Sequence, residues 1–329
     1  MSTLSRIQSQ IKPQLNQLNQ LIATTLRSSN ELMNGIIDNY LATKGKQIRP
    51  IMVILSGRLL GDINSPSLIS AAASVELLHN ASLIHDDVVD ETDMRRNQPT
   101  INGLWDNHIA VLVGDFFVSS SLQRALDTAD LRIISAVADL GKLLSLGEID
   151  QIYNARFHHI DRDAYFGIID RKTASLFVAC ARMGAYAVGA TDEQIAPLLD
   201  FARDLGLCFQ IKDDIFDYLP GDKIGKPTGN DLREGKITLP LIYALDNGTD
   251  SDNAAMIELS RKETLTSAEI DSLIAYARRQ GGIEYAAEQM QLMRDRAVGR
   301  LTAAYGTPES NPAVADLIDI FDYTIARDF

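Results

Sequence analysis

The chain carries one aspartate pattern twice, and each copy directly follows an apolar run with helical spacing. We call these copies the first aspartate motif, Asp86, Asp87 and Asp90, and the second aspartate motif, Asp213, Asp214 and Asp217. On a helix, residues i and i+4 lie about 40° apart around the axis, so the carboxylates of each motif share one face. A single cluster could be an acidic helix end, but a second copy with the same spacing argues for a shared role.

Clustered carboxylates repel one another unless a cation lies between them. Mg²⁺ prefers oxygen ligands, takes one or two carboxylates and keeps positions for substrate phosphates. Several such ions between two acidic helix ends would stabilise a diphosphate as it leaves. The two motifs therefore predict Mg²⁺-dependent chemistry on a diphosphate.

Basic residues near the first motif could bind the anionic substrate. Arg95 and Arg96 follow the motif closely, and guanidinium groups bind phosphates through paired hydrogen bonds. A basic turn precedes the next apolar run and contains Lys44, Gly45, Lys46, Arg49 and Pro50. This turn is interpreted either as an anion-binding turn or as a solvated loop.

Two polar groups interrupt helical patterns that are otherwise apolar. Lys172 and Thr173 interrupt an Ala/Phe/Ile surface, and polar side chains buried there need a ligand or a partner. His79 lies two turns before Asp86 and is interpreted as a hydrogen-bond donor to phosphate. With Glu76 it also forms the E-x-x-H pair of di-iron bundles. No other histidine follows a glutamate at that spacing, which disfavours a di-iron site.

The overall charge limits the classes of partner. The formal net charge is -13 and no long Lys/Arg run offsets it, which argues against nucleic acid or an anionic membrane as a partner. Cys180 and Cys208 lie in apolar helical patterns without metal-site or redox spacing, as expected of reduced core thiols. The N-terminal residues lack an apolar signal region, and no uninterrupted apolar run reaches about 18 residues. We therefore expect a soluble, cytoplasmic protein without a transmembrane segment.

Apolar residues recur at intervals of three and four along most of the chain. Helical stretches of roughly 12 to 25 residues are separated by Gly and Pro, and no segment shows sustained alternation. Thr266 and Glu269 predict a capping box at the start of a C-terminal helix. No linker or low-complexity break is visible, so the sequence predicts one all-α domain over residues 1–329.

The motifs of this chain and their order resemble those of the trans-isoprenyl (polyprenyl) diphosphate synthases. They most closely resemble those of the long-chain branch, which includes octaprenyl diphosphate synthases. The resemblance is carried by GKQIRP, ELLHNASLIHDDVVDETDMRR, VLVGDFF, GEIDQ, RKTASLF, FQIKDDIFDY and DLREGKITLPL. It implies a helical bundle around a deep central cavity, a homodimer, three Mg²⁺ ions per site and transient membrane contact during product release. The implied reaction adds isopentenyl diphosphate head-to-tail to an allylic diphosphate such as farnesyl or geranyl diphosphate.

The resemblance also implies roles for individual residues. The six motif aspartates would hold or orient Mg²⁺. Contacts to the allylic diphosphate would come from Arg95, Lys172, Lys226 and Lys236. Isopentenyl diphosphate would be bound by Gly45, Lys46, Arg49, His79 and Arg96. The developing carbocation would face Lys172, Thr173 and Gln210. Asn230 replaces an acid that is frequent in the family, and Arg327 near the C-terminus receives no role.

The residues before the first motif bear on product length. In the family, a bulky aromatic one turn before the motif accompanies C15 to C20 products, whereas Ala81 and Ser82 are small here. Leu78 continues the same wall, and Val137 on a neighbouring helix is expected at its floor. This predicts an all-trans product near C40, for a quinone side chain. The alternatives are close helix packing as the reason for the small residues, a short-chain synthase, a terpene cyclase and a non-catalytic partner subunit.

Overall fold

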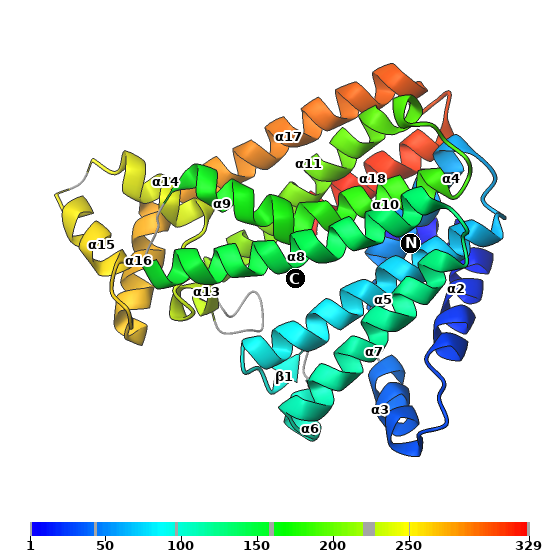
Figure 1. Ribbon diagram of the computed structural model, residues 1–329. Coiled ribbons are helices and arrows are strands. Elements are labelled where there is room, and N and C mark those ends of the chain that lie inside the picture. The colour runs from blue at the N-terminus through cyan, green and yellow to red at the C-terminus, as the bar shows by residue number, and fades with distance from the viewer. Residues whose placement is uncertain are drawn as a thin grey trace. The chain divides into compact units, whose positions relative to one another are not determined.

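The computed structural model describes residues 2–42, 45–95, 98–157, 161–219, 228–249 and 251–327. Within these ranges the regular elements are helices, apart from an antiparallel pair of two-residue strands, β1 (Met94–Arg95) and β2 (Gln98–Pro99) (Figure 1). The predicted all-α fold is confirmed. Three predicted anion-binding residues, Lys44, Arg96 and Lys226, lie outside the described residues.

The chain groups into two compact units, and each is described by itself. Unit 1 contains Met1–Gly141, Leu176–Leu199 and Pro308–Leu317; unit 2 contains Lys142–Ser175, Asp200–Thr307 and Ile318–Phe329. The predicted single domain and its deep central cavity stay predictions.

Unit 1 contains the N-terminal helices and the helix of the first aspartate motif. Its helices are α1 (Thr3–Gln10), α2 (Lys12–Thr25), α3 (Glu31–Ala42), α4 (Ile48–Leu60), α5 (Pro66–Val89), α6 (Ile101–Leu104) and α7 (Asn107–Leu126). The unit boundaries fall within four further helices, α8 (Leu131–Phe157), α10 (Ser175–Tyr186), α11 (Asp192–Asp217) and α18 (Pro312–Ala326).

Unit 2 contains the second motif, together with seven further elements within the described residues. They are α9 (Arg162–Ile169), the π-helical turn η1 (Asp170–Ala174), α13 (Asn230–Arg233), α14 (Leu239–Asn247), α15 (Asn253–Ser260), α16 (Ser267–Arg279) and α17 (Gly282–Tyr305). Its core lies around α14 and α16 and includes the buried rings of Tyr218 and Tyr276. The predicted capping box of Thr266 and Glu269 is confirmed at the start of α16.

Helix α5 ends at the first aspartate motif because the chain turns sharply there. Pro66 occupies its first turn, where a missing N–H costs no hydrogen bond. At its other end Glu91 is left-handed, with φ 50°. The Glu91 and Thr92 amides donate to the carbonyls of Val88 and Asp87, the pattern of a Schellman motif. This turn stops the helix just after Asp90.

Helices α5 and α7 lie side by side in unit 1 (Figure 1). Small residues allow this: a Cβ on Gly114 would lie 2.2 Å from Nε2 of His85. Deeper in the contact, the Ser74 hydroxyl donates to the Ser121 carbonyl at 2.9 Å and the Ser121 hydroxyl donates back to the Ser74 carbonyl at 2.7 Å. Close packing therefore explains at least Ser74 among the small residues of α5.

Both helices are long and apolar enough to span a membrane by length and composition. The most apolar window is 67% buried in α5 but only 39% buried in α7. Core helices of soluble proteins also meet this criterion, so it is weak evidence for a span, and the predicted lack of a transmembrane segment stays a prediction.

In unit 2, helix α8 approaches η1 very closely at Gly147. A Cβ at this glycine would lie 2.8 Å from the backbone nitrogen of Lys172, whereas a Cβ at Gly141 on the same helix would meet nothing within 4 Å. A backbone atom cannot move aside like a flexible side chain. Gly147 is therefore required where η1 presents Lys172 and Thr173.

We expect the two alanine variants of α8 to change stability in opposite directions. Gly147→Ala should lower the free energy of unfolding by about 1–3 kcal/mol because of the backbone clash. Gly141→Ala should raise it by about 0.5–1 kcal/mol, the usual gain of Ala over Gly within a helix. Urea unfolding of both variants measures this, and midpoints that shift in the same direction would contradict the close approach.

Candidate active site

The first aspartate motif lies on the last turn of α5, in unit 1. Asp87 is buried, and its carboxylate accepts a hydrogen bond from Nε of Arg95 at 2.7 Å. Burial raises the pKa of Asp87, although the Arg95 guanidinium acts in the opposite direction. Asp86 is half-buried and Asp90 is exposed. Asp86 and Asp90, one turn apart on one face, are thus the members better placed to bind an ion.

The second aspartate motif, at the end of α11 in unit 2, contains two carboxylates with extensive internal partners. Asp214 is buried and accepts hydrogen bonds from the Tyr165 hydroxyl at 2.6 Å and from Nε2 of Gln210 at 2.8 Å. The Asp217 carboxylate accepts the backbone N–H groups of Asn230 and Asp231, both at 3.0 Å, and so caps α13. Burial raises the pKa of both carboxyls, and these hydrogen bonds oppose that shift.

Asp213 differs from its two neighbours because its side chain is 41% exposed. One of its oxygens forms an ion pair with Arg327 at 2.5 Å. The Arg327 guanidinium also lies 4.0 Å from the ring centroid of Phe209 and donates to the Phe209 carbonyl. The sequence predicts no role for Arg327, because 114 residues separate it from Asp213 and no local pattern connects them.

The predicted carbocation-facing residues meet in unit 2. Thr173 donates from its hydroxyl to Oε1 of Gln210 at 2.7 Å. Lys172 forms an ion pair with Glu148 and donates to Oε1 of Gln151 at 3.2 Å. Both partners come from α8, on the GEIDQ segment.

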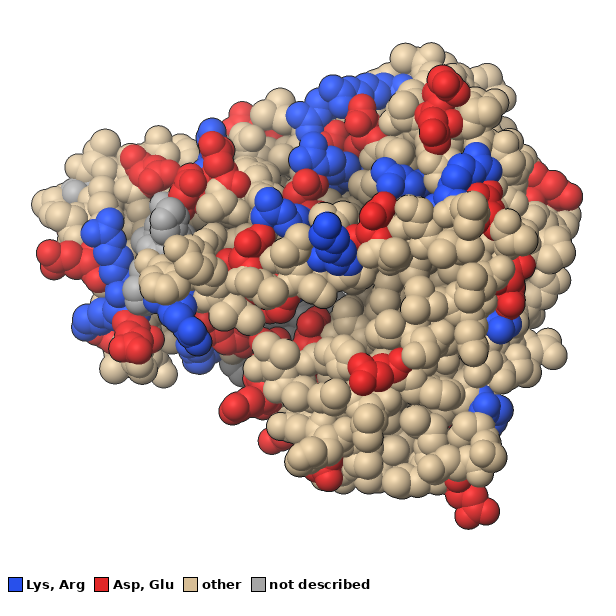
Figure 2. Space-filling view, in the orientation of Figure 1, with Lys and Arg blue, Asp and Glu red and all other residues tan. Residues whose placement is uncertain are grey.

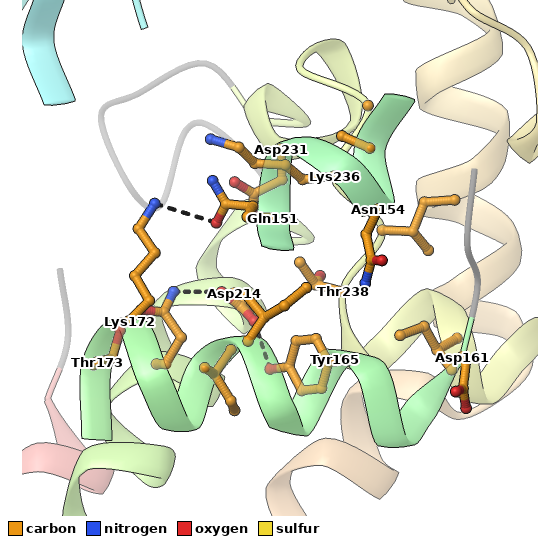
Figure 3. Close-up of a pocket in the computed structure, with 17 residues that line it drawn as sticks. Gln151, Asn154, Asp161, Tyr165, Lys172, Thr173, Asp214, Asp231, Lys236 and Thr238 are labelled. Atoms are coloured by element: carbon orange, nitrogen blue, oxygen red, sulfur yellow. Dashed lines mark hydrogen bonds between the residues drawn. The ribbon is translucent and has the colours of Figure 1, made fainter. Parts of the chain in front are cut away.

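These side chains line a cavity of about 170 Å³ (Figure 3). The polar part of its lining includes Gln151, Asn154, Asp161, Tyr165, Lys172, Thr173, Gln210, Asp214, Asp231, Lys236 and Thr238. Burial, followed by the charge of Asp214, raises the pKa of Asp231 well above its ordinary range. The cavity therefore combines the ammonium groups of Lys172 and Lys236 with the carboxylates of Asp214 and Asp231. The sequence does not identify Tyr165, because no short spacing distinguishes it, and it gives Asp231 no role although Asp231 begins the DLREGKITLPL motif.

The predicted isopentenyl-diphosphate residues that the structure describes all lie in unit 1. Gly45 and Lys46 are exposed, and His79 is 9% exposed on α5. The guanidinium of Arg49 lies 5.8 Å from the ring centroid of Phe177. Between Lys46 and Arg49, Gln47 is left-handed with φ 53°. Strain of this kind in a non-glycine residue is frequent at functional sites, which favours the anion-binding interpretation of the turn.

The predicted chain-length residues also lie in unit 1. Ala81 is fully buried, and Leu78 and Val137 are 6% and 2% exposed. Ser82 is half-buried and donates from its hydroxyl to the carbonyl of His79 at 2.9 Å. Their roles stay predictions.

The donor chemistry of the two motifs fits Mg²⁺. Among the described residues, no group of three or more His, Cys, Asp or Glu side chains is arranged to hold a metal on its own. Mg²⁺ does not need such a group, since it takes one or two carboxylates and completes its shell with water and substrate oxygens. The pair Asp86 and Asp90, and Asp213 separately, offer oxygen ligands of this kind.

Comparison with known proteins agrees with this chemistry. The profile of the family described as Polyprenyl synthetase matches residues 30–277. The chain is 35% identical to the octaprenyl diphosphate synthase of Haemophilus influenzae, over 99% of this chain and 98% of that protein.

Solved structures give the same result. A decaprenyl diphosphate synthase from Rhodobacter capsulatus superposes with a TM-score of 0.90 at 31% identity, covering 99% of this chain and 100% of the other. A geranylgeranyl pyrophosphate synthase from Bacteroides thetaiotaomicron has a TM-score of 0.83 at 37% identity, with 99% of each chain covered. The resemblance found in the motifs is confirmed: the chain belongs to the polyprenyl synthetase family, whose members are prenyltransferases.

Proposed function

We propose that this enzyme adds isopentenyl diphosphate units head-to-tail to an allylic diphosphate and makes a long all-trans polyprenyl diphosphate. The observation that carries the proposal is the unit 2 cavity beside the second aspartate motif. Its lining combines Lys172 and Lys236 with a hydroxyl and an amide, and includes no Cys or His among the described residues. Such a lining suits the release of an anion and the stabilisation of a cation better than nucleophilic catalysis.

The residues divide into those that bind ions and those that support them. Asp86, Asp90 and Asp213 would hold Mg²⁺, which when bound neutralises the departing diphosphate. The other three motif aspartates would fix the geometry through the partners that they already have. Lys172 and Lys236 would bind diphosphate oxygens, with Arg95 and Lys226 as further contacts.

The second substrate would be bound by the residues of the basic turn and by His79. Its double bond attacks the allylic cation, and the proton that is then lost moves to the diphosphate. The oxygens of Thr173 and Gln210 would face the positive charge. A terpene cyclase and a non-catalytic subunit remain weaker candidates, because both aspartate motifs are intact.

The first test is metal dependence combined with loss of single ligands. The purified protein should condense isopentenyl diphosphate with farnesyl diphosphate only when Mg²⁺ is present. Asp86→Ala and Asp213→Ala should each lower turnover at least about 100-fold, because each removes transition-state charge stabilisation. Asp139→Ala, an exposed aspartate on α8, is the control and should keep wild-type turnover. Undiminished activity in excess EDTA would refute the proposal.

We propose a product near C40, for the side chain of a quinone, with the tail running along α5 past Ala81 and Ser82. The similarity to octaprenyl and decaprenyl synthases supports this length, whereas the similarity to a geranylgeranyl synthase keeps a C20 product as the alternative. The Ser74–Ser121 hydrogen bonds indicate helix packing deeper along α5, so the proposal depends on the first turn before the motif.

Substitutions in that turn should shorten the product. Ala81→Tyr and Ser82→Phe each place a ring about 5.4 Å, one helical turn, from the first motif, and we expect products of C15 to C20 at undiminished first-step rates. Ala81→Ser, which stays small, is the control. Because Ala81 is fully buried, Ser82→Phe provides the test if the tyrosine variant does not fold. Mass spectrometry of the products decides, and an unchanged product distribution in both variants would exclude this path.

We also propose that the enzyme is a cytoplasmic homodimer. In unit 1, one face of α7 exposes Val111, Leu112, Leu122 and Leu126, and the surface over α7 in Figure 2 is formed largely by uncharged residues. In unit 2, one face of α8 exposes Leu143, Leu146, Ile149, Tyr153 and Phe157. Contiguous apolar faces of this kind mark interaction sites. A second copy of the chain suits them better than an anionic membrane, given the net charge of -13.

Charged residues in these faces should therefore weaken self-association. Leu112→Asp and Ile149→Asp, at positions that are each 61% exposed, should shift the sedimentation of the protein from dimer toward monomer. Leu292→Asp on α17, which is 57% exposed, is the matched control and should leave the dimer intact. A monomeric wild-type protein at micromolar concentration would contradict the proposal.

A further inference from the structure

A continuous chain of side-chain hydrogen bonds connects α9 to the cation-facing residues of unit 2. Tyr165 donates to Asp214, Gln210 donates to the other oxygen of Asp214, and Thr173 donates to Gln210. Figure 3 shows the Tyr165 hydroxyl directed at Asp214, with Thr173 farther to the left in the view. This series of hydrogen bonds thus begins at Tyr165, a residue that has no role yet in the proposed reaction.

The chemistry of the groups fixes the direction of each hydrogen bond. The Gln210 amide nitrogen can only donate, so it faces one oxygen of Asp214, while the Tyr165 hydroxyl donates to the other oxygen. The amide of Gln210 must then turn its nitrogen toward Asp214 and its oxygen toward Thr173. Because that amide oxygen can only accept, the Thr173 hydroxyl must donate to it. The lone pairs of the Thr173 oxygen are left for the cavity that Thr173 lines.

Burial makes this arrangement rigid. Asp214 is 4% exposed and Tyr165 is 6% exposed, so water cannot easily replace either partner. Both oxygens of Asp214 have protein donors at 2.6 and 2.8 Å, which makes this carboxylate a poor direct ligand for an ion. Its position instead suits the control of the Gln210 amide.

We propose that Tyr165 is a positioning residue of the reaction. Through Asp214 and Gln210 it holds the Thr173 oxygen with its lone pairs toward the developing allylic cation. This inference rests on the proposed function, because it needs a cation in the cavity. Removal of the Tyr165 hydroxyl should leave substrate and metal binding intact and should slow the chemical step.

The test is a double-mutant cycle between Tyr165→Phe and Thr173→Val in the full-length enzyme. Tyr165→Phe should lower kcat about 10-fold or more, while the KM of both diphosphates and the half-saturating Mg²⁺ concentration change less than about 2-fold. In the Thr173→Val background the same change should cost less than about 2-fold, since Tyr165 acts through Thr173. Additive losses, a wild-type kcat or a shifted Mg²⁺ requirement would overturn the inference.

Tyr276→Phe is the matched control. Tyr276 is 1% exposed in the same unit, and its hydroxyl donates to Oδ1 of Asn253, away from the residues that line the cavity. It should lose comparable thermal stability and keep kcat within about 3-fold of wild type. If Tyr165→Phe folds poorly, a cycle between Gln210→Met and Thr173→Val offers a second route, because Gln210→Met breaks the same series of hydrogen bonds next to Thr173 and should likewise cost less in the Thr173→Val background. Wild-type turnover tests the proposed function separately, since the cycle uses only ratios to wild type.

Discussion

Both aspartate motifs depend on one constraint: it costs free energy to place carboxylates close together and partly out of water. Buried charges need hydrogen bonds or counter-charges, and the protein provides them unequally. Arg95 pairs with Asp87, Tyr165 and Gln210 with Asp214, and two backbone amides of α13 with Asp217. These partners fix the helix ends in place. Asp213 has an ion pair with Arg327 but its side chain stays 41% exposed, and Asp86 is half-buried and Asp90 exposed, which suits their proposed role as ligands of an exchangeable ion.

The sequence could predict those features that depend on helix geometry over a few neighbouring residues. The interval of four residues puts Asp86 and Asp90 on one face, and the capping box at Thr266 depends on a side chain only three residues away. The all-α class follows from the same periodicity. The division of labour within each motif could not be predicted, because Asp213 and Asp214 are adjacent and chemically identical. Only tertiary packing buries one and exposes the other.

The partners that create this difference are distant in the chain. Tyr165 precedes Asp214 by 49 residues, and Arg327 follows Asp213 by 114. Neither belongs to a recognisable spacing, so no local rule could assign them. For the small residues of α5, the sequence pattern is clear but its cause is not. Their pattern was visible, but it fits both close packing and an open wall, and only the Ser74–Ser121 hydrogen bonds distinguish one position from the others.

In the π-helical turn η1, contacts with neighbouring helices hold an irregular backbone in place. A π-helical turn has a higher free energy than a regular α-helix. It is therefore kept only where contacts with neighbouring elements hold it in place. Three consecutive residues of η1 are each tied to a neighbouring helix: Asp170 to Arg203, Arg171 to Asp150, and Lys172 to Glu148. Gly147 removes the Cβ that would otherwise meet the Lys172 backbone. The ion pairs of Asp170 and Arg171 hold the turn from which Lys172 projects. The irregular backbone and the orientation of the Lys172 side chain therefore have one physical cause.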